Sequence, residues 1–232
     1  PPFFLSKINL QFRYIYMRMK ITIPNSLSEI KLSQYQKFLK IQQENEDEHF
    51  LASKMIEIFC GIPHKESYSL KAKDVYRITN ILANMFEQKP QLKRRFVLNG
   101  VEYGFIPNLD DMTLGEYVDL DTYISKWEEI DKAMAVLYRP ILDTYNDKYN
   151  IQEYKADGSE HFKDLPMDIV FGSMLFFYRL GIDLSKVMTS YLENNKEIQQ
   201  LLTHNSVLNG VGISQFSHSL KEILQDLKIS LN

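Results

Sequence analysis

Residues 95–106 read Arg-Phe-Val-Leu-Asn-Gly-Val-Glu-Tyr-Gly-Phe-Ile, and this stretch decides the fold. Its centre, Asn99-Gly100, supplies the two positive φ angles that a type I′ turn needs. Residues of high strand propensity flank the pair on both sides, so the sequence predicts an antiparallel β-hairpin. Pro107 and Asn108 close it.

Helical spacing of apolar residues is found on both sides of this hairpin. Thr113, followed by Glu116, predicts a capped helix start, while Gly61 and Gly181 predict helix ends. A polar, Tyr-rich stretch over 146–161 predicts an exposed loop or a weak hairpin. The predicted helices cover residues 33–43, 50–60, 71–88, 113–127, 133–138, 166–180, 184–202 and 214–227.

Ser33 with Gln36 predicts the capped start of the first helix, the acidic run 44–48 predicts a solvated loop, and residues 27–32 predict a short extended piece. Helical spacing places Tyr117, Leu120 and Ile124 on the buried side of their helix, and the small residues Gly172 and Ser173 are expected to permit close helix packing.

Alternation of apolar residues predicts short strands over 10–18 and 19–23. The fold class is therefore α+β and predominantly α-helical, with a small antiparallel sheet whose strands lie near 10–23 and 95–106. We expect an extended N-terminal arm or extension over 1–18 and one α-rich domain over 19–202. A flexible linker and a C-terminal helix follow over 203–232. The arm either adds a strand to a partner's sheet or forms an edge strand of its own sheet.

Composition excludes several classes of protein. The 232 residues carry a net charge of −3, so no strong positive field attracts nucleic acid or an anionic membrane. A single cysteine, Cys60, excludes an internal disulfide framework and a cysteine-based zinc cluster, and its place on an apolar helix face indicates a core residue. Apolar runs are too short for a membrane span, so the chain is expected to be soluble and made in a reducing cytoplasm.

Motifs for catalysis are missing. No phosphate-binding glycine loop and no serine-hydrolase elbow occurs, and the five histidines form no metal-binding pair. We therefore predict no catalytic residues, no metal ligands and no cofactor. The best candidate for metal or acid–base chemistry is an acidic cluster that capping and a solvated helix face also explain. Its members are Asp110, Asp111, Glu116, Asp119 and Asp121.

Tyrosine is the residue type in surplus: the chain has 14 Tyr and 14 Phe against one Trp. Most Phe residues fall on predicted core stripes, whereas two Tyr-rich stretches have no core assignment. Aromatic side chains are common anchors at protein interfaces. The candidate partner-binding residues are therefore Phe12, Tyr14, Tyr16, Tyr145, Tyr149 and Tyr154. The only basic run, Lys93–Arg95 with Lys89, is too small to predict a nucleic-acid surface.

Three stretches resemble uncharacterised proteins of tailed bacteriophages, especially crAss-like phages of Bacteroides. They begin Ile23-Pro-Asn-Ser-Leu-Ser-Glu-Ile, Tyr103-Gly-Phe-Ile-Pro-Asn-Leu-Asp-Asp and Met167-Asp-Ile-Val-Phe-Gly-Ser-Met, and together the matching stretches span most of the chain from Met19 onward. None is a catalytic motif, so no site residue carries over. The resemblance implies a virion or virion-assembly component, in the portal, neck or tail, or cargo inside the particle.

The leading hypothesis is therefore a non-enzymatic phage structural protein, made in the bacterial host cytoplasm and located in the virion. Its expected partners are portal, neck or tail proteins and further copies of itself. Three alternatives stay open: an assembly chaperone that leaves the virion, a metal-dependent enzyme using the cluster between Asp110 and Asp121, and a packaging helper that contacts DNA through Lys93–Arg95.

Overall fold

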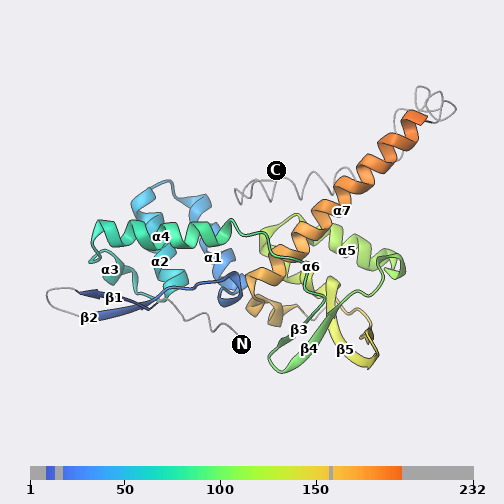
Figure 1. Ribbon diagram of the computed structural model, residues 1–232, viewed down its shortest axis with the longest axis horizontal. Coiled ribbons are helices and arrows are strands. Elements are labelled where there is room, and N and C mark those ends of the chain that lie inside the picture. Colours follow the sequence, from blue (N-terminus) through green and yellow to red (C-terminus); the bar gives the residue numbers. More distant parts are fainter. Residues whose placement is uncertain (1–8, 14–17, 157–158, 195–232) are drawn as a thin grey trace, which may run out of the picture. The chain divides into compact units, whose positions relative to one another are not determined.

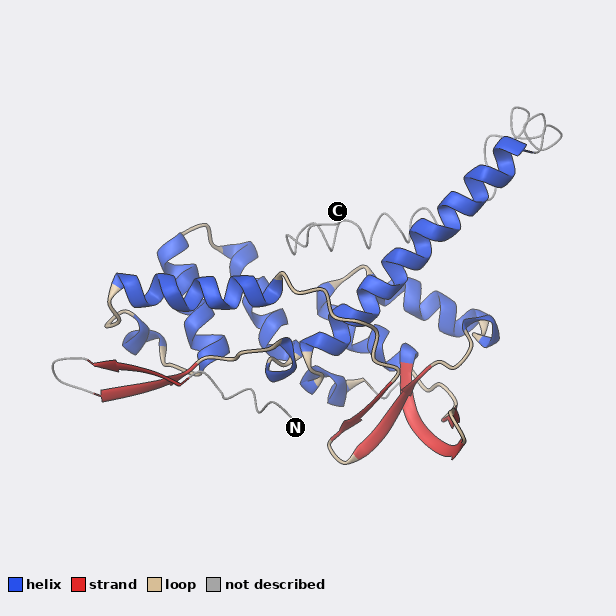
Figure 2. Ribbon diagram, in the orientation of Figure 1, coloured by secondary structure: helices blue, strands red, loops and turns tan. Residues whose placement is uncertain are grey.

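The computed structural model describes residues 9–13, 18–156 and 159–194. It confirms the predicted class: the fold is predominantly helical with a small four-stranded antiparallel sheet (Figure 2). The described residues form two compact units: 9–13 and 18–88 with 160–170, and 89–156 with 159 and 171–194. The sequence predicts one domain over 19–202, because the same kind of amphipathic segment continues across residue 88 and composition does not change there. Residues 203–232 lie outside the described part.

The first unit is built on helices (Figure 1). A 3₁₀ turn, η1 (Leu27–Glu29), stands where the sequence predicts a short extended piece, and η4 (Glu160–Asp164) returns to the unit. Between them lie α1 (Leu32–Glu44), α2 (Glu48–Cys60), α3 (His64–Ser67) and α4 (Ala72–Phe86). The prediction for α4 and the stop of α2 at Gly61, whose φ is 68°, are confirmed.

The starts of α1 and α2 depend on side chains that accept hydrogen bonds from backbone N–H groups. α1 begins before the predicted cap Ser33, because Gln34 rather than Gln36 accepts a hydrogen bond from the Lys31 N–H at 2.9 Å. The Asp47 carboxylate caps α2 by accepting hydrogen bonds from the backbone N–H groups of His49 and Phe50, and these bonds lower the pKa of Asp47. The acidic run that looks like a loop therefore contains a helix start.

The core of the first unit is aliphatic with an aromatic centre. Phe59 of α2 contacts Phe38 of α1 at 5.4 Å and Phe86 of α4 at 5.1 Å between ring centroids, and Tyr35 lies 5.2 Å from Phe86. These tilted and edge-on ring contacts add to the burial of apolar area. The side chains that are fully buried around them include Leu32, Ile56, Ile78 and Leu82.

Strands β1 (Asn9–Arg13) and β2 (Arg18–Thr22) form an antiparallel pair in which Phe12 lies opposite Met19. The segment near 10–23 thus pairs within its own chain, one of the two arrangements left open by the sequence. It forms a two-stranded sheet of its own, so the prediction of a single sheet that also includes the strands near 95–106 is wrong. Ile21 of β2 and Ile23, just after the strand, are almost fully buried, whereas Tyr14 and Tyr16 lie outside the described residues.

The second unit contains the four-stranded sheet, in the order β3-β4-β5-β6. The predicted hairpin is confirmed as β3 (Arg95–Leu98) and β4 (Val101–Phe105), with φ of 51° at Asn99 and 81° at Gly100. Sequence reasoning missed β5 (Tyr138–Tyr145), which continues through Pro140, and placed β6 (Lys148–Ile151) within a stretch predicted as an exposed loop or a weak hairpin. Pro140 lacks an N–H but its carbonyl accepts from Gln152 at 2.9 Å, so the strand tolerates it.

Four further elements belong to this unit. A 3₁₀ turn, η2 (Leu109–Asp111), leads to α5 (Leu114–Ile124), and η3 (Trp127–Glu129) leads to α6 (Ile130–Leu137). The predicted capping box of α5 is confirmed: Thr113 accepts from the Glu116 N–H, and the Glu116 carboxylate accepts from the Thr113 N–H at 2.7 Å. Helix α6 ends at Leu137, and β5 begins at the next residue.

α7 (Met167–Asn194) is one continuous helix, whereas the sequence predicts an end at Gly181 and a second helix from residue 184 (Figure 1). Gly181 is buried and does not adopt the left-handed conformation that ends a helix. A glycine within a helix costs about 1 kcal/mol relative to alanine, which packing can offset. From Phe171 onward α7 belongs to the second unit, where Phe176 and Phe177 contact Phe105 of the sheet.

Gly172 permits a close approach in this unit. A Cβ at this position would lie 2.6 Å from the carbonyl oxygen of Gln91. Because that neighbour is backbone, it cannot swing aside as a side chain would. The sequence prediction that small residues of this helix allow close packing fits this contact.

We expect Gly172→Ala to lower the free energy of unfolding by about 1–3 kcal/mol, the usual cost of overpacking. Gly115→Ala is the matched control, since a Cβ there meets no atom within 4 Å and its site is also helical. That variant should leave stability unchanged or slightly raised. Urea unfolding measures both, and equal stability of the two variants would contradict the close approach.

Candidate functional site

The second unit holds an open pocket of about 910 Å³. One wall is the segment 106–113 with the first turn of α5, and the other is β6 with the residues that follow it. Arg139 of β5 and Arg94, which precedes β3, complete the lining. Pockets of this size bind ligands of the size of a small molecule or a peptide segment.

A buried ion pair lies at one side of the pocket. Nη1 of Arg139 donates to Oε1 of Glu116 at 2.6 Å, and the two side chains are 12% and 6% exposed. The other carboxylate oxygen accepts from both the N–H and the hydroxyl of Thr113. Burial by itself raises the pKa of Glu116, but the Thr113 hydrogen bonds and the Arg139 charge outweigh burial, so the pKa lies below its ordinary value.

Tyr149 forms part of the pocket lining and is buried. Its hydroxyl donates to the carbonyl of Phe105 at 2.7 Å, with the carbonyl of Arg94 at 3.2 Å. Burial raises the pKa of Tyr149, and the nearby Arg94 and Arg95 charges oppose that rise. A Cβ on Gly104 would overlap the Tyr149 ring, so the glycine makes room for this side chain.

Tyr154 lies on the same wall, after the end of β6, and its hydroxyl donates to Oδ2 of Asp119 in α5 at 2.9 Å. Burial raises the pKa of Tyr154, and the hydrogen bond to Asp119 raises it further. Tyr154 is therefore a neutral donor at physiological pH. It joins the segment after β6 to helix α5 and fixes the width of the pocket at that point.

Charges of both signs line the pocket. Arg94 and Lys148 are exposed cations with no ion pair among the described residues, and Asp111, Asp147 and Glu153 are exposed anions. Apolar surface comes from the aliphatic residues of the two walls together with the two Tyr rings. A phosphate-rich ligand requires a positive field, which three anions reduce. A polypeptide, with charges of both signs and many amides, matches this lining.

The residues of the predicted acidic cluster make separate contacts and do not gather into one site. Glu116 is engaged by Arg139 and Thr113, while Asp119 accepts from Tyr154. Asp110 and Asp111 belong to η2, which Asn108 caps through the N–H of Asp110. Within residues 9–13, 18–156 and 159–194, no group of three or more acidic, His or Cys side chains is placed to hold a metal ion.

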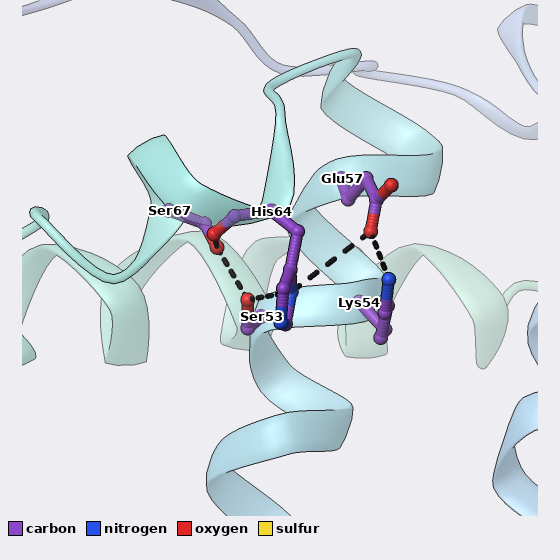
Figure 3. Close-up of polar contacts among 5 residues, drawn as sticks. All are labelled: Ser53, Lys54, Glu57, His64 and Ser67. Carbon is purple, nitrogen blue, oxygen red and sulfur yellow. Dashed lines mark hydrogen bonds and ion pairs between the residues drawn. The ribbon is translucent and has the colours of Figure 1, made fainter.

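The first unit contains a Ser–His–Glu arrangement that the sequence does not reveal (Figure 3). Nδ1 of His64 lies 2.8 Å from the Ser53 hydroxyl and 3.9 Å from Oε2 of Glu57, which also pairs with Lys54 at 2.6 Å. Ser53 contacts the hydroxyl of Ser67 as well. Ser53 and Ser67 are buried, and all five side chains come from α2 and α3.

The hydrogens of this network can be assigned. The Ser67 hydroxyl donates to the carbonyl of His64 at 2.7 Å, so Ser67 accepts from Ser53. The Ser53 hydroxyl therefore accepts from His64, whose proton lies on Nδ1. A catalytic relay needs the serine and the carboxylate on different ring nitrogens, whereas both approach Nδ1 here. The network accordingly holds α3 against α2 and does not activate Ser53.

Cys60 ends α2, and burial raises the pKa of its thiol to about 12. The thiol therefore stays protonated at neutral pH, and it lacks the reactivity of a nucleophilic cysteine.

None of the helices in the described ranges combines the length and the apolar character needed to cross a bilayer.

The structure separates the six candidate partner-binding residues. Tyr145 is 79% exposed at the end of β5, Tyr154 is half-buried, and Tyr149 is buried within the unit. The exposed loop or weak hairpin predicted over 146–161 is wrong at Tyr149, because the Tyr149 ring packs over Gly104; Tyr145, which is exposed, lies just before that stretch. Phe12 lies in β1, and Tyr14 and Tyr16 lie outside the described residues.

Sequence reasoning missed the two arginines of the pocket. Arg94 was assigned only to a basic run, and Arg139 followed a predicted helix with no partner indicated. No pattern in the sequence connects Arg139 with Glu116, since the pairing arises when β5 aligns with β4. No family model, curated protein or solved structure matches this chain, so the site is interpreted from its own geometry.

We expect Glu116→Gln to lower the free energy of unfolding by about 3 kcal/mol at pH 7, because it leaves the Arg139 charge buried without a partner. The exposed pair of Arg95 and Glu102, at 3.0 Å, provides the control. Glu102→Gln should cost less than about 1 kcal/mol. Chemical unfolding at pH 7 measures both, and similar costs would contradict the buried pair.

The same pair predicts a pH dependence of stability. The folded-state pKa of Glu116 is lowered, so its contribution is fully present above the unfolded-state pKa of about 4.3 and is lost as pH falls through the folded value. The stability difference between wild type and Glu116→Gln should therefore shrink below about pH 4.5. Unfolding curves between pH 7 and pH 3 measure it, and a constant difference would rule out the charged pair as its source.

For the first unit we expect Ser53 to resist labelling by a fluorophosphonate probe, because its hydroxyl is buried and donates to Ser67. Ser53→Ala should lower stability by about 1–3 kcal/mol, since the Nδ1–H of His64 and the Ser67 hydroxyl lose their partner. Ser69→Ala, at an exposed serine, is the control. Stoichiometric labelling of Ser53 would show an activated nucleophile.

Proposed function

We propose that this protein works without catalysis, through protein–protein contacts, as a structural component of a tailed-phage virion. The observation that supports contact with a polypeptide is the pocket lining, which combines three exposed anions and apolar surface with two cations that have no ion pair among the described residues. The assignment to a virion rests on the resemblance of the stretches that begin at Ile23, Tyr103 and Met167. Portal, neck or tail proteins are the proposed partners, with further copies of the chain as a second possibility.

The pocket lining favours recognition over turnover. The buried carboxylate of Glu116 is held by Arg139 and Thr113, which makes it a poor proton acceptor. The hydroxyls of Tyr149 and Tyr154 are committed to internal acceptors. What remains available to a ligand is the pair of cations, the anions and the apolar walls, which bind and orient a partner chain.

Mass spectrometry of purified, intact virions tests this proposal. We expect the protein among the virion proteins, at a copy number that fits a ring or a cargo. Detection only as a free species in infected cells, at every stage of infection, would contradict the virion assignment. The protein would then act during assembly and leave before maturation.

A second experiment tests the pocket itself. Arg94→Glu combined with Lys148→Glu reverses both unpaired cations, so we expect loss of co-purification with the virion partner. Lys73→Glu is the matched control, because it reverses an exposed lysine of the first unit. Thermal unfolding should show that all variants are folded. Equal recovery of the partner by both charge-reversed proteins would exclude the pocket as the contact surface.

A further inference from the structure

Helix α5 has apolar side chains on two faces. One face, with Leu120 and Ile124, is buried in the second unit, as predicted. Tyr117 was predicted on that same face, yet it is 43% exposed. It shares the outer side of the helix with Leu114, which is 79% exposed, and Val118, which is 51% exposed.

These three residues form one continuous stripe, because positions i, i+3 and i+4 of a helix are neighbours. They account for three of the nine exposed large apolar side chains in the described part of the chain. The stripe continues at i+7 with the exposed Asp121. A helix-in-groove or helix-on-helix contact uses anchors at this spacing.

A second amphipathic segment of the same chain has no assigned partner. Ser214 predicts a helix cap, and Phe216, Leu220, Ile223, Leu224 and Leu227 follow at helical spacing. In a helix these five residues would occupy one apolar face that water disfavours. This segment lies outside the described residues.

Chain length allows the two segments to meet. Nineteen residues, 195–213, separate the end of α7 from Ser214, and extended they reach roughly 65 Å. From Phe171 to Asn194 the helix measures about 35 Å. The ring centroids of Phe171 and Trp127 lie 6.4 Å apart, and Trp127 follows α5 in the chain. The route from Asn194 along α7 to Phe171, across to Trp127 and back along the chain onto α5 is about 60 Å long, so the linking residues can span it.

Charge favours this pairing over self-association. Glu116 is paired with Arg139 and Asp119 accepts from Tyr154, so the exposed charge beside the stripe is Asp121, and α5 has no basic residue that a second copy could place against it. The segment 214–228 has Lys221 and Lys228 on one flank of its apolar face and Glu222 and Asp226 on the other, so the lysine flank is the one that complements Asp121. Either lysine can approach Asp121 at the end of the stripe.

We propose that residues 214–227 dock as an amphipathic helix on the stripe of Leu114, Tyr117 and Val118 in the same chain. The contact covers the outer face of α5, next to Thr113 at the edge of the pocket. This inference goes beyond the proposed function and does not depend on it, since it concerns a contact within one chain.

Cysteine cross-linking in the full chain tests this inference. In a Cys60→Ser background, Val118→Cys is combined with Leu224→Cys, and a short bismaleimide joins thiols that lie close together. We expect a link within one chain whose yield does not change on dilution. The control combines Leu224→Cys with Tyr76→Cys, which replaces a residue that is 69% exposed in the first unit. That pair should link much less.

Two outcomes would overturn the proposal. Links only between chains, with a yield that rises with concentration, would identify a second copy as the occupant. A yield no higher than that of the Tyr76→Cys control would show that the segment does not dock, and would leave the stripe to a partner protein.

A labelling experiment gives an independent readout. With Val118→Cys as the only cysteine, Leu220→Asp in the distant segment should accelerate reaction of the thiol with maleimide several-fold, because the cover is removed. The reaction of Tyr76→Cys should not change. Identical rates at Val118→Cys with and without Leu220→Asp would contradict docking, whatever the cross-linking yield.

Discussion

The buried ion pair between Glu116 and Arg139 is the constraint on which the second unit depends. Two charges taken out of water require each other, and removing one partner costs several kcal/mol. Glu116 also closes the capping box of α5, so one carboxylate ties the start of a helix to strand β5. The distance between α5 and the sheet is thereby fixed, and with it one side of the pocket.

Tyr149 and Tyr154 extend this arrangement to the other wall. Tyr149 of β6 donates to the carbonyl of Phe105 in β4 and packs over Gly104, so β6 contacts β4 as well as its neighbour β5. Tyr154 donates to Asp119 on α5, which brings the chain after β6 back to the same helix. Each hydroxyl is satisfied by an internal acceptor, and the open space between the walls is left with charged side chains directed at solvent. This combination of internally satisfied hydroxyls and exposed charges is the basis for the proposal that the pocket binds a polypeptide.

Sequence reasoning found the features that local physics determines. The Asn99-Gly100 turn, the Gly61 stop and the Thr113 capping box follow from φ angles and short-range hydrogen bonds, and all three are confirmed. It failed where a distant contact decides. β5 was missed because Pro140 usually ends regular structure, and its place is set by pairing with β4. The continuation of α7 through Gly181 was missed because burial offsets the glycine cost.

The pocket was beyond sequence reasoning for a related reason. Its parts come from residues 94, 106–116, 139 and 147–154, and each part has an ordinary local explanation. The sequence explains the acidic cluster as helix capping and solvated surface, and Glu116 does cap α5. Its ion pair with Arg139 cannot be predicted, because it forms only when β5 takes its place in the sheet.

Tyr117 shows the converse error. Helical periodicity assigned it to the buried side, yet a helix with apolar residues on two faces has no unique buried side. Burial of Leu120 and Ile124 settles the orientation and leaves Leu114, Tyr117 and Val118 outside. An exposed apolar stripe on a helix is unfavourable in water unless something covers it, so its presence constrains what the rest of the chain, or its partner, must provide.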